Sequence, residues 1–202
     1  MILTGPDISD QLEPISARGW PPEVVETLGQ WRLHATRGHS GRANACWPIG
    51  APDRPLGEAV LAVEAWYGDR GLPPLFRPAD LPATEALRGV LAGWGYGPRT
   101  QTLVMVGPLA EGASQDVRIA ADPGDAFSGV FLATAHDPDD AAERMETLLR
   151  LAHPRAFAHV ERDGAALAIG ALAVEGEWAI LTLKDGEMTA GPIRIGAAAR
   201  AH

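Results

Sequence analysis

The chain has 202 residues, 46% hydrophobic and 21% charged, which is typical of a globular protein with a sizeable core. Its formal net charge of −9 argues against nucleic acid as the main partner, because phosphate binding requires a concentrated positive field. Cys46 is the only cysteine, which excludes an internal disulfide and indicates a reducing compartment. No apolar run approaches the roughly 18 residues of a membrane span, and the start has no signal-peptide pattern. We therefore expect a cytoplasmic protein without a membrane partner.

The first part of the chain predicts an arm followed by two strands. Residues 1–28 are expected to form a loosely held arm or a short helix, because prolines recur in them. Apolar and polar residues then alternate over 31–36, as in a half-buried strand. A second strand is expected after the glycine-bearing turn at 38–41. It would place Arg42 and Asn44 on one face.

Helical spacing of apolar residues begins after residue 55. The spacing predicts helices over 56–67 and 84–94, each ended by glycine. The pair at 75–76 is flanked by prolines and is predicted as a short edge strand, and 100–106 as a further strand. Residues 29–107 are therefore expected to form an α+β half with a mixed sheet.

The remainder is expected to be a second half joined by a short linker. Residues 108–115 are small, polar and glycine-bearing, as expected of a junction, and 116–202 form the second half. The run 127–133 fits a strand or a helix equally well. Asp137 begins an Asp-Pro-Asp-Asp sequence, a strong helix start with a cap, a proline in the first turn and favourable acids.

Near the end, an antiparallel meander is predicted. The apolar runs 156–161 and 166–174 are separated by a turn containing Asp163 and Gly164, a strong hairpin signal because both turn positions require positive φ. A third run, 178–183, follows after another compact turn. The middle run is apolar on both faces, so it should be the central strand and covered on both sides.

Two continuations after this meander remain open. A glycine-bearing loop followed by a helix would place main-chain amides around an anion such as a diphosphate. Alternatively, 184–187 forms a second Asp-Gly hairpin and 188–195 a fourth strand, which leaves no such site.

Parts of the chain resemble a bacterial group within the GNAT superfamily of N-acetyltransferases. The segment 29–48 matches the opening of that group at Trp31, Gly38, Ser40, Arg42, Asn44 and Pro48. It departs at His34, where arginine is usual, and at Ala45, where serine is usual. The stretch 156–183 is similar to the second, third and fourth strands of an acetyltransferase unit. The resemblance implies a GNAT-like α+β fold of two halves with mostly antiparallel sheets and flanking helices.

The resemblance also implies acetyl-CoA as the donor. Main-chain groups of Leu181, Thr182 and Leu183 would contact its thioester and pantetheine. The family's diphosphate-binding signature is approached only around Arg194, Gly196 and Ala197, with the glycine one position early. The helix and last strand that follow in the family are absent from this sequence. The sequence therefore also fits a truncated or inactive member, a pseudoenzyme.

Acetyl transfer by this route requires a base that takes a proton from the amine. Glu175 and Glu177 lie beside the predicted strand and are the candidates, with solvated turn carboxylates as the alternative reading. Arg42 and Asn44 would either order a polar substrate or form structural hydrogen bonds. The histidines and the cysteine match no standard zinc spacing, so no metal is expected.

The sequence leaves the function open between two classes. The first is an acetyltransferase acting on an amine of a small molecule or peptide. The second is a non-catalytic binding or assembly protein on a degenerate acetyltransferase fold. An open sheet edge beside 178–183 would also favour pairing of two copies into a homodimer.

Overall fold

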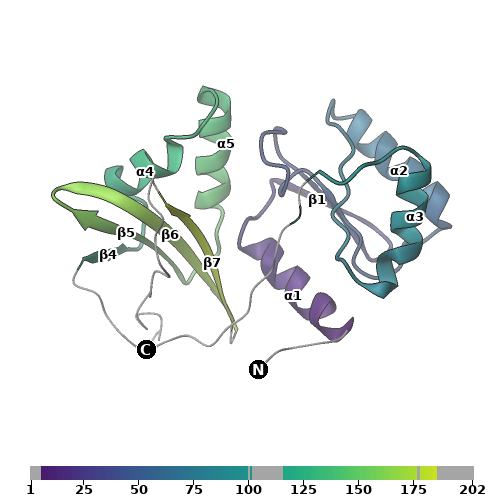
Figure 1. Cartoon of the computed structure of the whole chain (residues 1–202), viewed down its shortest axis with the longest axis horizontal. Helices are drawn as coiled ribbons and strands as arrows, with labels where there is room; N and C mark the ends of the chain where they lie inside the picture. The colour runs from purple at the N-terminus through teal and green to yellow at the C-terminus, as the bar shows by residue number, and fades with distance from the viewer. Residues whose placement is uncertain (1–5, 100, 102–115, 177, 186–202) are drawn as a thin grey trace. The chain divides into compact units, whose positions relative to one another are not determined.

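The protein is described by a computed structural model. It describes residues 6–99, 101, 116–176 and 178–185. The contacts divide the chain into two compact units, an N-terminal unit, Met1–Met105, and a C-terminal unit, Val106–His202 (Figure 1). Each unit combines helices with an antiparallel sheet, which confirms the predicted α+β class. The predicted division into an arm at 1–28, a half at 29–107, a junction at 108–115 and a half at 116–202 stays a prediction. No helix in the described part of the chain is both long and apolar enough to cross a membrane.

The N-terminal unit contains a three-stranded sheet in the order β1-β2-β3. Its strands are β1 (Val24–Leu28), β2 (Trp31–Ala35) and β3 (Cys46–Trp47), and both pairings are antiparallel. The strand predicted at 75–76 is present only as a parallel bridge between Cys46 and Phe76. The strand predicted over 100–106 lies outside the described residues, apart from Gln101.

Two expectations for this sheet were wrong in detail. The second predicted strand is shorter, because Arg42 and Asn44 lie in a turn that precedes β3. The side chain of His34 is buried at 3% exposure, although the alternating pattern placed it on the polar face. The sequence pattern also missed β1, in which only Leu28 is buried.

The helices of this unit are α1 (Pro6–Arg18), α2 (Leu56–Gly68), the 3₁₀ helix η1 (Pro82–Thr84) and α3 (Glu85–Gly93). Both long helices predicted from periodicity are present. Trp94 follows α3 and is 45% exposed. The helix ends one residue earlier, so Trp94 no longer follows the helical spacing of the buried leucines.

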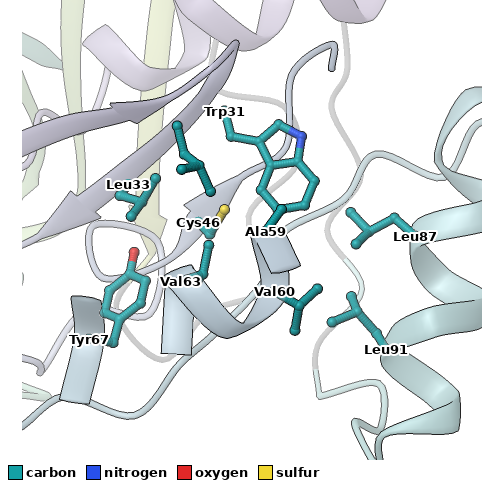
Figure 2. Close-up of a cluster of buried hydrophobic side chains, with 10 residues drawn as sticks. Trp31, Leu33, Cys46, Ala59, Val60, Val63, Tyr67, Leu87 and Leu91 are labelled. Atoms are coloured by element: carbon teal, nitrogen blue, oxygen red, sulfur yellow. The ribbon is translucent and has the colours of Figure 1, made fainter. Parts of the chain in front are cut away.

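The core of the N-terminal unit lies between the sheet and the two helices α2 and α3 (Figure 2). The sheet contributes aromatic and aliphatic side chains, α2 contributes one face of four residues, and α3 contributes two leucines. The buried cluster comprises Leu28, Trp31, Leu33, Cys46, Ala59, Val60, Val63, Tyr67, Leu87 and Leu91. Burial of this apolar surface is the main favourable term in the stability of the unit.

The C-terminal unit contains a four-stranded antiparallel sheet in the order β4-β5-β6-β7. Its strands are β4 (Val117–Ala120), β5 (Arg155–Arg162), β6 (Ala165–Glu175) and β7 (Trp178–Asp185). The predicted meander is confirmed, and β6 lies between two neighbours as expected. Its residues from Ala168 to Ala173 are all buried, which agrees with a strand that is apolar on both faces.

The turn between β5 and β6 has the geometry that the Asp-Gly pair predicts. Asp163 has φ 53° and Gly164 has φ 77°, so both central positions are left-handed. The turn sets the pairing of Arg162 with Ala165 and of Glu161 with Ala166, and the register then shifts by one residue at a bulge between Val160 and Glu161.

Two helices complete the C-terminal unit, α4 (Asp125–Leu132) and α5 (Pro138–Leu149). The ambiguous run is helical, and its Phe127 packs edge-on against Phe157 of β5 at 5.4 Å between ring centroids. The start of α5 is confirmed, because the Asp137 carboxylate accepts a hydrogen bond from the main-chain N–H of Asp140 at 2.8 Å. Leu148 of α5 is buried, whereas Leu149 is 47% exposed.

Candidate functional site

The β6–β7 hairpin carries the part of the predicted acetyl-CoA site that the structure describes. β7 pairs with β6 from Trp178 to Asp185 and has no further neighbour in the described sheet. Alternate N–H and C=O groups of such an edge strand point away from its partner and are available to a ligand. Within the described residues, the main chain of residues 181–183 therefore lies at the edge of the sheet, and the Leu181 side chain is 42% exposed.

The amide-bearing arm and thioester of acetyl-CoA, which the resemblance implies for this strand, would need main-chain donors and acceptors in a row. The residues predicted to hold its diphosphate, Arg194, Gly196 and Ala197, lie outside the described residues. The alternative fourth strand over 188–195 does too.

Of the two candidate bases, Glu175 is described and Glu177 lies outside the described residues. Glu175 is the last residue of β6 and lies opposite Trp178, next to Gly176 with φ 56°. Leu181 pairs with Leu172, three residues from Glu175, so the two are separated by about 10 Å along the ladder. That is longer than a hydrogen bond, so proton transfer from a substrate beside Leu181 to Glu175 needs an intervening water.

Arg42 contacts the first helix. Its Nη2 donates a hydrogen bond to the main-chain oxygen of Ser16 in α1 at 2.9 Å. Its Nε is buried and has no hydrogen-bond partner among the described residues. Burial, and next the charge of Arg77, lower the pKa of Arg42 to about 10, so it is a cation at neutral pH. This side chain joins α1 to the turn that precedes β3.

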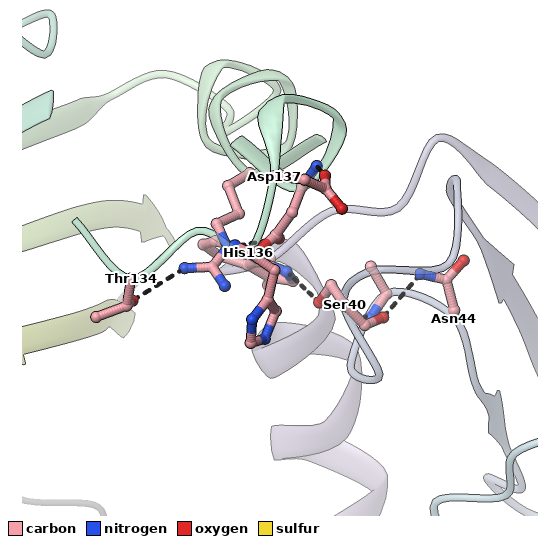
Figure 3. A network of polar contacts seen from close by, with 9 residues as sticks. Ser40, Asn44, Thr134, His136 and Asp137 are labelled. Carbon is pink, nitrogen blue, oxygen red and sulfur yellow. Dashed lines mark hydrogen bonds and ion pairs between the residues drawn. The ribbon is translucent and has the colours of Figure 1, made fainter. Parts of the chain in front are cut away.

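The Asn44 side chain is buried and closes the loop between β2 and β3 (Figure 3). Its Oδ1 accepts from the main-chain N–H of Thr36 at 2.7 Å. Its Nδ2 donates to Thr36 Oγ1 at 2.6 Å and to the main-chain oxygen of Ser40 at 2.7 Å. All these contacts are within the loop.

A charged pair that the sequence did not indicate lies next to this loop. The Arg77 guanidinium stacks 4.0 Å from the centroid of the Trp47 ring, and its Nη1 lies 3.5 Å from Glu13 Oε2. The main-chain N–H of Arg77 donates to the Cys46 oxygen at 2.8 Å, which fixes the segment beside β3. Arg77 and Glu13 are far apart in sequence and belong to no motif, so no local signal could have joined them.

His34 contacts Trp47, the ring on which Arg77 stacks. Its ring is tilted against Trp47, with centroids 5.0 Å apart, and its Nδ1 has no hydrogen-bond partner among the described residues. The Tyr67 hydroxyl donates to the His34 main-chain oxygen at 2.8 Å. Burial, followed by the charges of Arg77 and Arg32, lowers the pKa of His34 to about 4.

We predict that His34 makes the protein less stable in mild acid. The unfolded chain takes up this proton near pH 6.5 and the folded chain only near pH 4, so stability falls as pH drops between these values. The expected loss between pH 7 and pH 5 is about 2 kcal/mol. Urea unfolding at both pH values should show it, and His34→Leu should remove it. His39→Gln, at an exposed histidine of the same unit, should keep the wild-type loss, and an unchanged loss in His34→Leu would contradict the assignment.

No group of three or more histidine, cysteine or acidic side chains in the described ranges is placed to hold a metal ion. Burial raises the pKa of the Cys46 thiol, which keeps it protonated at neutral pH.

Comparisons with known proteins bear on the family of the chain. Residues 7–174 match the family described as "Probable histone acetyltransferase Rv0428c C-terminal". The uncharacterized N-acetyltransferase YobR of Bacillus subtilis (strain 168) is 35% identical over 66 residues, which cover 33% of this chain and 26% of that protein. The match thus spans about a quarter of the length of this curated relative. No solved structure matches the chain. Because the family match covers most of the chain and extends into both of its units, the chain belongs to the acetyltransferase-like family described as probable histone acetyltransferase Rv0428c C-terminal.

Proposed function

We propose that the chain is a GNAT-type N-acetyltransferase that transfers the acetyl group of acetyl-CoA to an amine of a small molecule or peptide. The observation that carries this proposal is the family match over residues 7–174. The similarity to an N-acetyltransferase of Bacillus subtilis supports it. The match ends at Val174 in β6, so the roles of Glu175 and of β7 rest on the resemblance and on the position of β7 at the edge of the described sheet.

Acetyl-CoA supplies an acyl group activated as a thioester. Main-chain N–H groups of residues 181–183 would donate to the thioester oxygen, where negative charge develops as the amine attacks. Glu175, through intervening water, or Glu177 would take the proton from the attacking amine. The net charge of −9 favours the approach of a cationic amine over that of an anionic acceptor.

Thermal melting of the whole chain with acetyl-CoA tests this proposal. A ligand that binds only the folded protein raises its melting temperature, so millimolar acetyl-CoA should give a clear rise. Glu175→Gln should keep that rise and lower the acetylation rate by about 100-fold if Glu175 is the base. A melting temperature that does not respond to acetyl-CoA would contradict the proposal. It would leave the non-catalytic binding or assembly protein as the reading of this fold.

A further inference from the structure

A separate pocket lies within the N-terminal unit, formed by α1, the segment after β3, the start of α2 and the region around η1. Its volume is about 400 Å³, within the range of small-molecule sites. Apolar side chains make up most of its wall, among them Ile49, Pro52, Leu56 and Leu81. The only two charged residues of the wall have opposite signs, Glu13 and Arg77.

Arg77 is held in place but has unused donors. Its guanidinium is stacked on Trp47 and is only 22% exposed, so little side-chain entropy remains to be lost on binding. A guanidinium carries five N–H donors in a planar fork. Among the described residues, its one side-chain hydrogen bond is the long contact of 3.5 Å to Glu13. The fork is therefore free to bind a carboxylate through two parallel hydrogen bonds.

Glu13 complements this arginine from α1. Its side chain is 16% exposed. Burial raises the pKa of its carboxyl above the usual range, and the opposing effects of Arg77 and Arg42 do not cancel that increase. The ionised carboxylate is therefore incompletely compensated in the folded protein. A cation placed against it would supply the missing compensation.

The two charges select a ligand that carries both signs. A purely anionic ligand would be repelled by Glu13, and a purely cationic one by Arg77. In an α-amino acid the ammonium and the carboxylate are attached to the same carbon, which places them side by side as Glu13 and Arg77 are. The remaining volume is lined by aliphatic side chains and suits an apolar group.

We propose that this pocket binds a zwitterionic α-amino acid with an apolar side chain, its carboxylate on Arg77, its ammonium on Glu13, and its side chain against Leu56 and Leu81. All residues of the site lie in one unit, so the proposal is independent of acetyl transfer and of the β7 edge.

Calorimetric titration of the whole chain with L-leucine tests the proposal. We expect a dissociation constant of about 1 mM or lower. N-acetyl-L-leucine lacks the ammonium and L-leucinamide lacks the carboxylate, so each should bind at least about tenfold more weakly. Stronger binding of either analogue than of L-leucine, or no binding of L-leucine at 10 mM, would overturn the proposal.

Variants assign the binding to this pocket. Glu13→Gln keeps the side-chain shape, and Arg77→Lys keeps the charge but loses the planar fork, so each should weaken L-leucine binding by about tenfold or more. Arg88→Gln removes an exposed arginine of the same unit that does not line the pocket, and should bind as the wild type does. If Arg77→Lys does not fold, Glu13→Gln and the two analogues decide the question. Wild-type affinity in Glu13→Gln would overturn the proposed ammonium contact and the site with it.

Discussion

Replacement of Gly29 by alanine is expected to destabilise the N-terminal unit by about 3 kcal/mol. Gly29 lies in the turn between β1 and β2 with φ 61°, a conformation that disfavours any side chain. A methyl group there would overlap the main-chain N of Asp53 and lie 2.6 Å from the carbonyl carbon of Pro52. Main-chain atoms cannot rotate away, so the turn and the segment facing it must separate.

The Gly29→Ala substitution should also affect the pocket, because Ala51 and Pro52, which face Gly29, form part of the pocket wall. The Gln30 main-chain N–H donates to the Ala51 oxygen at 2.8 Å, and the Ala51 N–H donates to Gln30 Oε1 at 2.8 Å. Gly29→Ala strains both hydrogen bonds and should also weaken L-leucine binding. Trp178 is the only tryptophan of the C-terminal unit, so tryptophan fluorescence during urea unfolding reports mainly on the N-terminal unit.

Gly71 provides the matched control. It has φ 66°, nearly the same as Gly29, but nothing lies within 4 Å of a methyl group at that position. Gly71→Ala should therefore cost only the backbone term of about 1 kcal/mol. Equal losses in the two variants would show that the contact with residues 51–53 contributes nothing to stability.

Asn44→Ala is expected to cost about 3 kcal/mol, because one substitution removes three short hydrogen bonds and leaves buried partners unsatisfied. The loop that Asn44 closes leads directly into β3, which carries Trp47. Trp47 in turn supports the Arg77 guanidinium. The variant should therefore lose L-leucine affinity as well as stability, measured by the same urea unfolding and titration.

Thr36→Ser is the control for this loop. It retains the hydroxyl that accepts from Asn44 and the main-chain N–H that donates to it, so it should stay within about 1 kcal/mol of wild type. A loss in Asn44→Ala no larger than that in Thr36→Ser would contradict the structural role assigned to the asparagine.

Local signals in the sequence were sufficient where a short segment determines its own conformation. Asp163 and Gly164 favour the left-handed turn that the structure contains. Asp137 caps α5 through its own carboxylate. Helical spacing likewise identified α2, whose buried residues Val60 and Val63 lie on one face. In each case the deciding interactions are within a few residues.

The sequence was insufficient where distant residues decide the outcome. β1 exposes Val24 and Val25, so its state depends on pairing with β2 and not on a hydrophobic pattern of its own. Arg42 and Asn44 looked like one face of a strand, but the hydrogen bonds of Asn44 hold the segment in a turn. Glu13 and Arg77 are brought together only by the packing of α1, which no local motif encodes.

The most direct test of the proposed function is whether the protein transfers an acetyl group. The whole chain is incubated with acetyl-CoA and a panel of amines that includes a histone-tail peptide, and both the released thiol and the acetylated amine are measured. We expect one class of amine to give acetylated product in amounts equal to the thiol released. Thiol release no greater than in buffer, with no acetylated product from any amine of the panel, would contradict it.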